Sequence, residues 1–432
     1  MSLYFRHRTI RPFQKELMWD IYDAISQRRT ILTHAPTGSG KTDAALSAAI
    51  TYARENDLTV FFLTPKISQH KIALDVVKGI SDKYLLGLRA VDMVGRSHCC
   101  IDESLQELDS EGLLTSCIRK RQKAECVFYG NARGYNRIQE AKADARFRKL
   151  LDGYGSGKSH HELVQEGTGQ LCCPYEWLLK LASVSDVIVA DYHHIMIPHI
   201  RDIFLMKIRK RIEDSIIIVD EAHNLASRVR DSLSRSVSTF LFARMAKEMR
   251  SLGLDAGPVE EEFRTWSAEL LGDSKERVVQ AADFSSFLGR FGLTLEEAAA
   301  RLEDAGVAYV EKHGRKSACL RLAMFLAAWG EEGAGCVRIL RGGNGHYFLS
   351  KRMLDPSPAT RILNESAASV LMSGTLIPLE MHRDVLGLDK DKAILKSYPS
   401  PFDTSSVVNI ITEDLTTRYS KRDLEGYTAI AK

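Results

Sequence analysis

The chain has 432 residues, of which 44% are hydrophobic and 27% are charged. This length exceeds what one compact core usually holds, so we expect two or more domains in a protein of ordinary globular composition. No apolar run reaches the roughly 18 residues of a membrane-spanning helix, and the first residues are too polar for a signal peptide. We therefore expect a cytoplasmic protein with no membrane partner. The net charge of +3 neither requires nor excludes nucleic acid.

The first predicted element is a helix over residues 11–27, with Pro12 in its first turn. Apolar runs rich in β-branched residues then predict strands over residues 30–33, 59–63, 186–190, 215–219 and 369–372. Unbroken apolar strands separated by helical segments are typical of a parallel sheet that is covered on both faces. The expected fold class is therefore α/β, with a doubly wound parallel sheet. Two segments interrupt the pattern: a cysteine-rich, basic one from about residue 91 and a mostly helical one from about residue 236.

A glycine-rich turn follows the first predicted strand and precedes an alanine-rich helix. It consists of Ala35, Pro36, Thr37, Gly38, Ser39, Gly40, Lys41 and Thr42. Backbone N–H groups of such a turn can point at a phosphate chain, Lys41 can reach the terminal phosphates, and the Thr42 hydroxyl can hold Mg²⁺. We predict a phosphate-binding loop, although its first position is Ala35 rather than glycine. The similar stretch 153–159 has no apolar strand before it, and we expect a solvated loop there.

The predicted strand 215–219 runs into Asp220, Glu221, Ala222 and His223. A buried strand that ends in two carboxylates suits a nucleoside triphosphatase, in which Asp220 would hold Mg²⁺ and Glu221 would polarise the attacking water. His223 would lie at the edge of the nucleotide site. The plainer alternative is an acidic loop at a strand end. Residues 373–376, after the last predicted strand, also allow two interpretations: small hydroxyl residues that hydrogen-bond the carboxylates or relay the nucleotide state, or a simple turn. For Gln14 the alternatives are a contact to adenine and a solvated side chain.

Six of the eight cysteines lie between Cys99 and Cys173, in an order without paired C-x-x-C spacing. Four separated thiolates can still bind Zn²⁺ or a [4Fe–4S] cluster, whereas the alternative is buried thiols that behave as small apolar residues. Basic and aromatic residues alternate around them over residues 119–149. Such a segment can hold phosphates and stack bases, or it can be a solvated helix face.

Taken in order, these motifs resemble the XPD-type iron–sulfur DNA helicases of superfamily 2, whose relatives include the DinG-like and FANCJ-like enzymes. Residues 11–14 resemble the family's Q motif, residues 35–42 its motif I, residues 220–223 its DEAH box and residues 373–376 its motif III. The resemblance implies a RecA-like fold, ATP and Mg²⁺ as cofactors, and 5′-to-3′ movement on single-stranded and fork DNA in repair or transcription, in the nucleoid or the nucleus. It also implies a [4Fe–4S] cluster with the ligands Cys100, Cys117, Cys126 and Cys173.

The resemblance further implies a division of the chain. The motor domain would comprise residues 1–90, 179–235 and 353–399, the iron–sulfur domain residues 91–178, and a helical Arch domain residues 236–352. Residues 400–432 would begin a second motor domain, which we expect to be incomplete here. The expected activity is ATP-dependent DNA unwinding. The alternative is an ATP- and DNA-binding regulator that lacks productive turnover.

Overall fold

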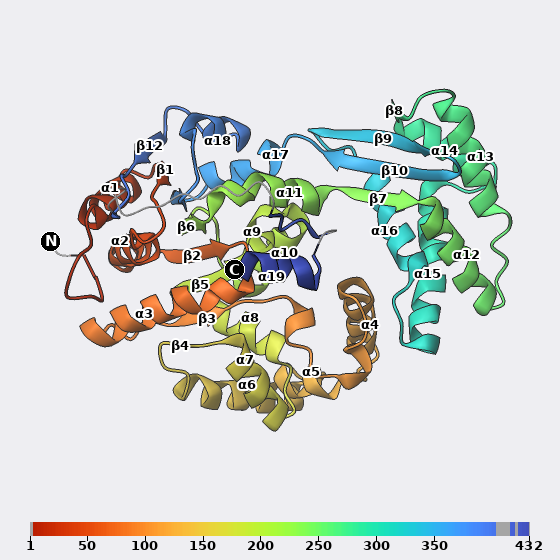
Figure 1. Ribbon diagram of the computed structural model, residues 1–432. Helices are drawn as coiled ribbons and strands as arrows, with labels where there is room; N and C mark the ends of the chain where they lie inside the picture. The colour runs from red at the N-terminus through yellow and green to blue at the C-terminus, as the bar shows by residue number, and fades with distance from the viewer. Residues whose placement is uncertain (1–2, 403–414, 420–421, 432) are drawn as a thin grey trace.

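An eight-stranded sheet forms the centre of the computed structural model, which describes residues 3–402, 415–419 and 422–431 (Figure 1). The strand order is β12-β1-β11-β6-β2-β5-β3-β4, and every pairing described in it is parallel. The strands are β1 (Thr30–His34), β2 (Thr59–Thr64), β3 (Ala90–Asp92), β4 (Gly157–Lys158), β5 (Val187–Asp191), β6 (Ser215–Asp220), β11 (Ala368–Ser373) and β12 (Ala393–Ser397). The predicted α/β class is confirmed.

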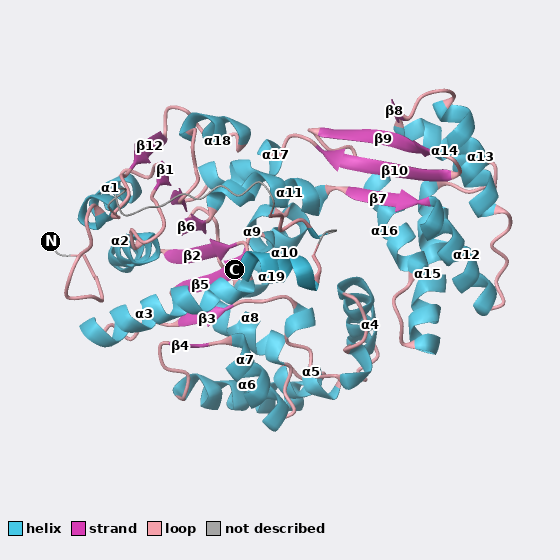
Figure 2. Ribbon diagram, viewed as in Figure 1, coloured by secondary structure: helices cyan, strands magenta, loops and turns pink. Residues whose placement is uncertain are grey.

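Both faces of this sheet are buried, because alternate residues of each central strand enter different apolar cores. On β2, Phe61 and Leu63 belong to one core, whereas Val60 and Phe62 belong to the other. The second core is covered by α1 (Gln14–Ser26), α2 (Lys41–Asn56) and α3 (His70–Tyr84). The first is covered by α8 (Pro174–Val184), α9 (His193–Met196), α10 (Pro198–Ile208), α11 (Leu225–Leu233), α17 (Ser357–Thr360) and α18 (Leu379–Val385) (Figure 2). Burial on two sides explains why the strands read as continuous apolar runs.

The first helix begins later than the sequence predicted, at Gln14 rather than Arg11. Phe13 has a φ of 60°, which is left-handed backbone and cannot continue a helix backward. The side-chain Oε1 of Gln14 also accepts a hydrogen bond from the backbone N–H of Arg11, at 3.0 Å. The segment before the helix is thereby held as a turn.

The cysteine-rich segment is mostly helical and joins the edge of the main sheet. Its helices are α4 (Ser110–Gln122), α5 (Val127–Ala132), α6 (Arg137–Asp152) and α7 (His160–Gly169). The stretch 153–159 was predicted to be a solvated loop, but it contains β4, which pairs with β3, and the buried Tyr154. The Tyr154 hydroxyl donates a hydrogen bond to the Ala90 carbonyl oxygen at 2.8 Å. This glycine-rich stretch therefore builds the sheet edge.

The second interrupting segment contains an antiparallel sheet that the sequence analysis did not predict. Its strand order is β7-β10-β9-β8, and the strands are β7 (Arg235–Ser238), β8 (Glu276–Val278), β9 (Cys336–Gly343) and β10 (His346–Met353). An aromatic core of Phe242, Phe263, Trp266, Phe284 and Trp329 lies between this sheet and its helices. The helices are α12 (Thr239–Ser251), α13 (Val259–Leu271), α14 (Ala281–Gly289), α15 (Leu295–His313) and α16 (Ala318–Gly330).

The two interrupting segments pack against each other through α4 and α15 (Figure 1). A small apolar core joins them, formed by Leu105, Leu108, Leu113, Val307, Val310 and Leu320. At its side, the Arg119 guanidinium and the Glu311 carboxylate lie 2.9 Å apart, with both groups largely exposed. An exposed ion pair contributes little to the free energy of such a contact. Burial of the six apolar residues is therefore the main stabilising contribution to the packing of the two segments.

Near the end of the chain, α19 (Leu424–Ala431) is a short, exposed helix. Residues 403–414, 420–421 and 432 lie outside the described residues, so the expected start of a second motor domain over residues 400–432 stays a prediction. Within the described ranges, none of the helices combines the length and apolar character needed to cross a membrane.

Candidate nucleotide site and thiol cavity

Three neighbouring strands of the main sheet end at one edge and bring the predicted nucleotide-site residues together. The strands are β1, β11 and β6, and they lead into the glycine-rich loop, Ser373 and Asp220. The backbone N–H of Ala35 donates to the carbonyl oxygen of Ser373 at 3.0 Å, which ties the start of the loop to the end of β11. Carboxyl edges of parallel sheets are where ligands bind in open α/β folds.

The glycine-rich loop takes a conformation that only glycine adopts without strain. Gly38 and Gly40 have φ values of 87° and 73°, and Gly40 precedes α2 as its N-cap. A Cβ atom on Gly40 would lie 2.1 Å from the Nε2 atom of Gln14. The loop therefore needs glycine both for its backbone angle and for the approach of a neighbouring side chain.

Gln14 and Arg11 hold the outer side of this loop. The Gln14 Nε2 atom donates to the Gly40 carbonyl oxygen at 3.0 Å, and an Arg11 side-chain nitrogen donates to the Gly38 carbonyl oxygen at 2.6 Å. Gln14 is buried, and both ends of its amide are used within the protein. In this state Gln14 fixes the loop, and its contact with adenine remains a prediction.

The first residue of α2, Lys41, faces the carboxylates that end β6. Its Nζ atom lies 3.2 Å from Oε1 of Glu221. Asp220 is buried beside this pair, and burial raises the pKa of its carboxyl group to about 6, with the negative charge of Glu221 adding to the rise and Lys41 opposing it. Ionising a buried carboxyl group costs free energy when no cation is bound beside it. A divalent cation offsets that cost, so such a group is well suited to bind one.

Glu221 itself has a φ of 49°, left-handed backbone that is uncommon for a residue with a side chain. Its N–H donates to the Oδ1 atom of Asp220 at 3.0 Å. The hydroxyl of Tyr192 donates to the carbonyl oxygen of Asp220 and also lies 3.0 Å from the carbonyl oxygen of Glu221. This contact of Tyr192 was not predicted from the sequence, because no local pattern shows where a tyrosine hydroxyl will find its acceptor.

His223 and Ser373 complete the edge of the site. The Nδ1 atom of His223 lies 2.7 Å from the Ser373 hydroxyl oxygen, and this hydroxyl lies 3.2 Å from Oε2 of Glu221. The backbone N–H of Thr375 donates to the same oxygen at 3.1 Å. Of the two readings for residues 373–376, this geometry favours the one in which a small hydroxyl residue contacts the carboxylates.

The four predicted ligand cysteines line a single small cavity between α4, α5 and the start of α8. They are Cys100, Cys117, Cys126 and Cys173, whereas Cys99 and Cys172 do not line it. Burial raises the pKa of the Cys173 thiol to about 12 and also raises the pKa values of Cys100 and Cys126. Within the described part of the chain, no three His, Cys, Asp or Glu side chains are grouped closely enough to hold a single metal ion. The thiols share a cavity without forming a one-ion site.

Beside the thiols, a buried carboxylate gathers three arginines. Glu176 lies 3.3 Å from Arg96, 2.9 Å from Arg133 and 3.9 Å from Arg121. These positive charges hold its pKa below the usual range against the opposing effect of burial. Arg96 also stacks on Tyr175, with its guanidinium carbon 4.0 Å from the ring centre. Arg121 and Arg133 belong to the basic segment 119–149, which was predicted to be able to hold phosphates. Their pairing with Glu176 shows that part of this positive charge stabilises the segment itself.

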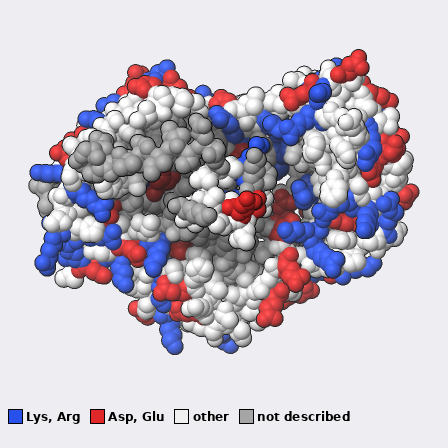
Figure 3. All heavy atoms as spheres, viewed as in Figure 1, with Lys and Arg blue, Asp and Glu red and all other residues white. Residues whose placement is uncertain are grey.

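A second basic surface lies on the antiparallel sheet, outside the segment in which the sequence analysis placed basic contacts. It is a groove that we call the arginine groove, lined by Arg230, Asp231, Ser234, Arg235, Ser236, Arg341, Phe348, Ser350, Arg352, Met353 and Leu354. Figure 3 shows Lys and Arg atoms grouped in the region of β9 and β10. Arg341 lies over the exposed ring of Phe348, at 5.5 Å from the ring centre. Strands that are distant in sequence contribute these residues, which explains why no motif revealed them.

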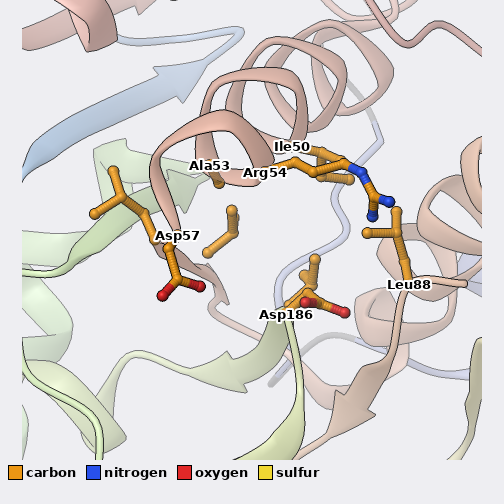
Figure 4. Close-up of a pocket in the computed structure, with 9 residues that line it drawn as sticks. Ile50, Ala53, Arg54, Asp57, Leu88 and Asp186 are labelled. Carbon is orange, nitrogen blue, oxygen red and sulfur yellow. The ribbon is translucent and has the colours of Figure 1, made fainter. Parts of the chain in front are cut away.

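Another cavity lies at the opposite, amino edge of the main sheet (Figure 4). Charged side chains on its rim include Arg54, Asp57 and Asp186, around apolar walls. Arg54 donates to the Leu86 carbonyl oxygen at 3.0 Å, and Asp186 accepts from the backbone N–H of Arg89 at 2.8 Å. The cavity is remote from the phosphate loop, and two of its charged groups have partners in the chain.

The fold and the order of groups at its carboxyl edge define a RecA-like α/β protein with a P-loop. Two family models match parts of the chain. One is described as DEAD_2 and matches residues 67–240, and the other is described as type III restriction enzyme, res subunit, and matches residues 7–98. By these matches and by its curated relatives, the chain is similar to XPD-type superfamily 2 helicases.

Two curated relatives illustrate the similarity. The general transcription and DNA repair factor IIH helicase subunit XPD/RAD3 of Saccharomyces cerevisiae is 24% identical over 315 residues, which cover 67% of this chain and 38% of the relative. The ATP-dependent DNA helicase XPD of Sulfolobus acidocaldarius is 23% identical over 432 residues, covering 96% of this chain and 67% of the relative. The chain thus spans well under two thirds of the length of the yeast relative.

A solved structure titled XPD_Helicase has a similar fold, with a TM-score of 0.60 at 18% sequence identity. The match covers 90% of this chain and 63% of that one. This likeness supports the RecA-like sheet with its two insertions.

Proposed function

We propose that the chain carries the first motor domain and the two inserted domains of an ATP-dependent DNA helicase, which moves 5′ to 3′ on single-stranded DNA and opens forks in repair or transcription, in the nucleoid or the nucleus. The observation that carries this proposal is the meeting of Lys41, Glu221 and Ser373 at one edge of the sheet. The names of the relatives support DNA as the substrate.

In this proposal, arrival of ATP breaks the pair between Lys41 and Glu221. The triphosphate competes for the Lys41 ammonium, with Pro36, Thr37, Gly38, Ser39 and Gly40 surrounding it. Glu221 is then released to accept a proton from the attacking water. Asp220 and Thr42 would hold Mg²⁺, which would neutralise phosphate charge. His223 and Ser373 stay in contact with the Glu221 carboxylate, and they connect its position and charge to the end of β11.

The proposed division assigns residues 91–178 to an iron–sulfur domain and residues 236–352 to an Arch domain. The donor set fits a [4Fe–4S] cluster, because four thiols line the cavity, and the carboxylate that also lines it, Asp102, is paired with Lys120 at 2.7 Å. Each cysteine of such a cluster binds a different iron, so its sulfurs lie farther apart than the ligands of a single ion. That spacing agrees with four thiols that share a cavity without forming a one-ion site.

Two features support nucleic acid as the partner of the arginine groove. Arginine side chains bind phosphates, and the exposed Phe348 offers a face on which a base can stack. Single-stranded nucleic acid presents both groups at once.

The proposal is tested by ATP hydrolysis of the whole chain, purified anaerobically, with and without single-stranded DNA. Lys41→Ala should abolish nucleotide binding and turnover. Lys158→Ala is the matched control, because Lys158 follows a similar Ser-Gly pair but pairs with Glu166 at 2.8 Å. Unchanged nucleotide affinity in Lys41→Ala would overturn the P-loop assignment. Nucleotide and DNA binding without turnover would instead support the regulator alternative.

A further inference from the structure

The residue that follows β5, Tyr192, reaches across the sheet to the backbone of the two acidic residues at the end of β6. Strands β5 and β6 are not neighbours, since β2 lies between them. The Tyr192 side chain is buried, and its hydroxyl contacts the carbonyl oxygens of both Asp220 and Glu221. A single phenol therefore connects the ends of two separated strands.

The backbone that this phenol contacts is also the one that needs support. Glu221 has left-handed backbone, which a non-glycine residue keeps only where its surroundings enforce it. Its carbonyl oxygen accepts a second hydrogen bond, from the N–H of Asn224 at 2.9 Å. The direction of the Glu221 side chain follows from this conformation, because Cβ projects from the same Cα that carries the unusual φ.

The turn that carries Tyr192 is itself fixed from both sides. Asp191 accepts from the backbone N–H of His193 at 2.8 Å and contacts the Nδ1 atom of His194 at 3.2 Å. The Nε2 atom of His193 lies 2.7 Å from the Ser232 hydroxyl on α11. The turn that carries the phenol is therefore held by hydrogen bonds within the turn and to α11.

We propose that Tyr192 is a positioning residue, whose hydroxyl holds the Asp220–Glu221 backbone so that Glu221 is aimed at the water that attacks ATP. This inference rests on the proposed function. If the phenol only filled the core, its hydroxyl could donate to any nearby acceptor. Instead, it contacts the carbonyl oxygens of two consecutive residues, the proposed metal ligand Asp220 and the proposed base Glu221.

The test compares Tyr192→Phe with Tyr154→Phe in the whole chain. Both tyrosines are buried and both donate to a backbone carbonyl, but Tyr154 binds Ala90 at the start of β3, at the opposite edge of the sheet. The measurements are kcat, KM for ATP, and the number of nucleotide-binding sites per chain. We expect Tyr192→Phe to lower kcat per binding site by about tenfold, the effect of losing one useful hydrogen bond, with KM nearly unchanged. Tyr154→Phe should leave kcat per site at the wild-type value.

A merely structural role predicts a different result, namely fewer binding-competent sites with an unchanged kcat for each. That outcome, or an equal loss in both variants, would overturn the inference. If the wild-type chain binds ADP but does not turn over ATP, the readout becomes the affinity for ADP with fluoroaluminate relative to ADP alone. Tyr192→Phe should lower this ratio, and an unchanged ratio would refute the positioning role. Failure of the wild-type chain to bind any nucleotide would remove the proposed function, and this inference with it.

Discussion

The Nδ1 atom of His223 lies 2.7 Å from the hydroxyl oxygen of Ser373, although 150 residues separate them in the chain. The contact joins the turn after β6 to the end of β11, its neighbour in the sheet. The same hydroxyl lies 3.2 Å from the Glu221 carboxylate, so a displacement of Glu221 would change the contacts at the ends of both strands.

Removal of this hydroxyl should therefore affect turnover more than binding. We expect Ser373→Ala to lower ATP turnover by about tenfold, since one hydrogen bond to a charged group is lost, while the affinity for nucleotide changes little. Steady-state kinetics and equilibrium nucleotide binding measure the two effects separately. Ser369→Ala is the control on the same strand, because the buried hydroxyl of Ser369 donates to the carbonyl oxygen of Leu363 instead, at 3.0 Å. Equal losses in both variants would contradict a specific role for Ser373.

Asp220 should make the metal-free protein less stable as the pH rises. Its folded pKa of about 6 is above the ordinary value of 3.8, so the penalty for ionising it appears between these two pH values. Asp220→Asn removes that penalty. Its stability gain over wild type should be larger at pH 7.5 than at pH 4.5, by on the order of 2 kcal/mol.

Urea unfolding with a chelator present measures this difference. Added Mg²⁺ should then stabilise the wild-type chain at pH 7.5 but not Asp220→Asn. A gain that is independent of pH would show that Asp220 does not titrate in this range.

The sequence predicted the sheet well because each central strand is marked by its own residues. The strand expected over residues 215–219 is Ser215–Asp220, since burial on both faces demands an unbroken apolar run. The hairpin of β9 and β10 was missed, although Asn344–Gly345 at its turn is a common hairpin signal.

The site was predictable only as far as its motifs reach. Lys41, Glu221 and Ser373 belong to local patterns, and the fold brings them together. The contacts of Glu176 and Tyr192 could not be predicted from these motifs, because their partners lie far along the chain or across the sheet. Contacts of this kind are specified by the tertiary structure rather than by spacing.

The thiol cavity leads to a prediction about iron. Anaerobically purified wild-type chain should contain about four iron atoms, as expected for one [4Fe–4S] cluster. Cys126→Ala should lose most of this iron and the brown colour, because one of the four thiols that line the cavity is removed. Cys172→Ala is the matched control, since Cys172 is a buried thiol that does not line the cavity. Equal iron in Cys126→Ala and wild type would exclude Cys126 as a ligand, and zinc in place of iron would refute the cluster.

The arginine groove should contribute to binding of single-stranded DNA through charge. Arg341→Glu replaces an exposed cation over Phe348 with an anion, so DNA affinity should fall by about tenfold at low salt. The slope of affinity against salt concentration on logarithmic axes should also become shallower by about one, because fewer counterions are released when the complex forms. Fluorescence anisotropy of a labelled oligonucleotide over a salt series measures both quantities.

Arg290→Glu is the matched control for this prediction. Arg290 is likewise an exposed arginine of the second inserted segment, but it pairs with Glu262 and Glu269 and does not line the groove. Both variants change the net charge by the same amount, so a nonspecific effect of total charge would weaken DNA binding equally in each. A loss confined to Arg341→Glu places a phosphate at the groove, whereas equal losses would mean that the DNA lies elsewhere on the chain.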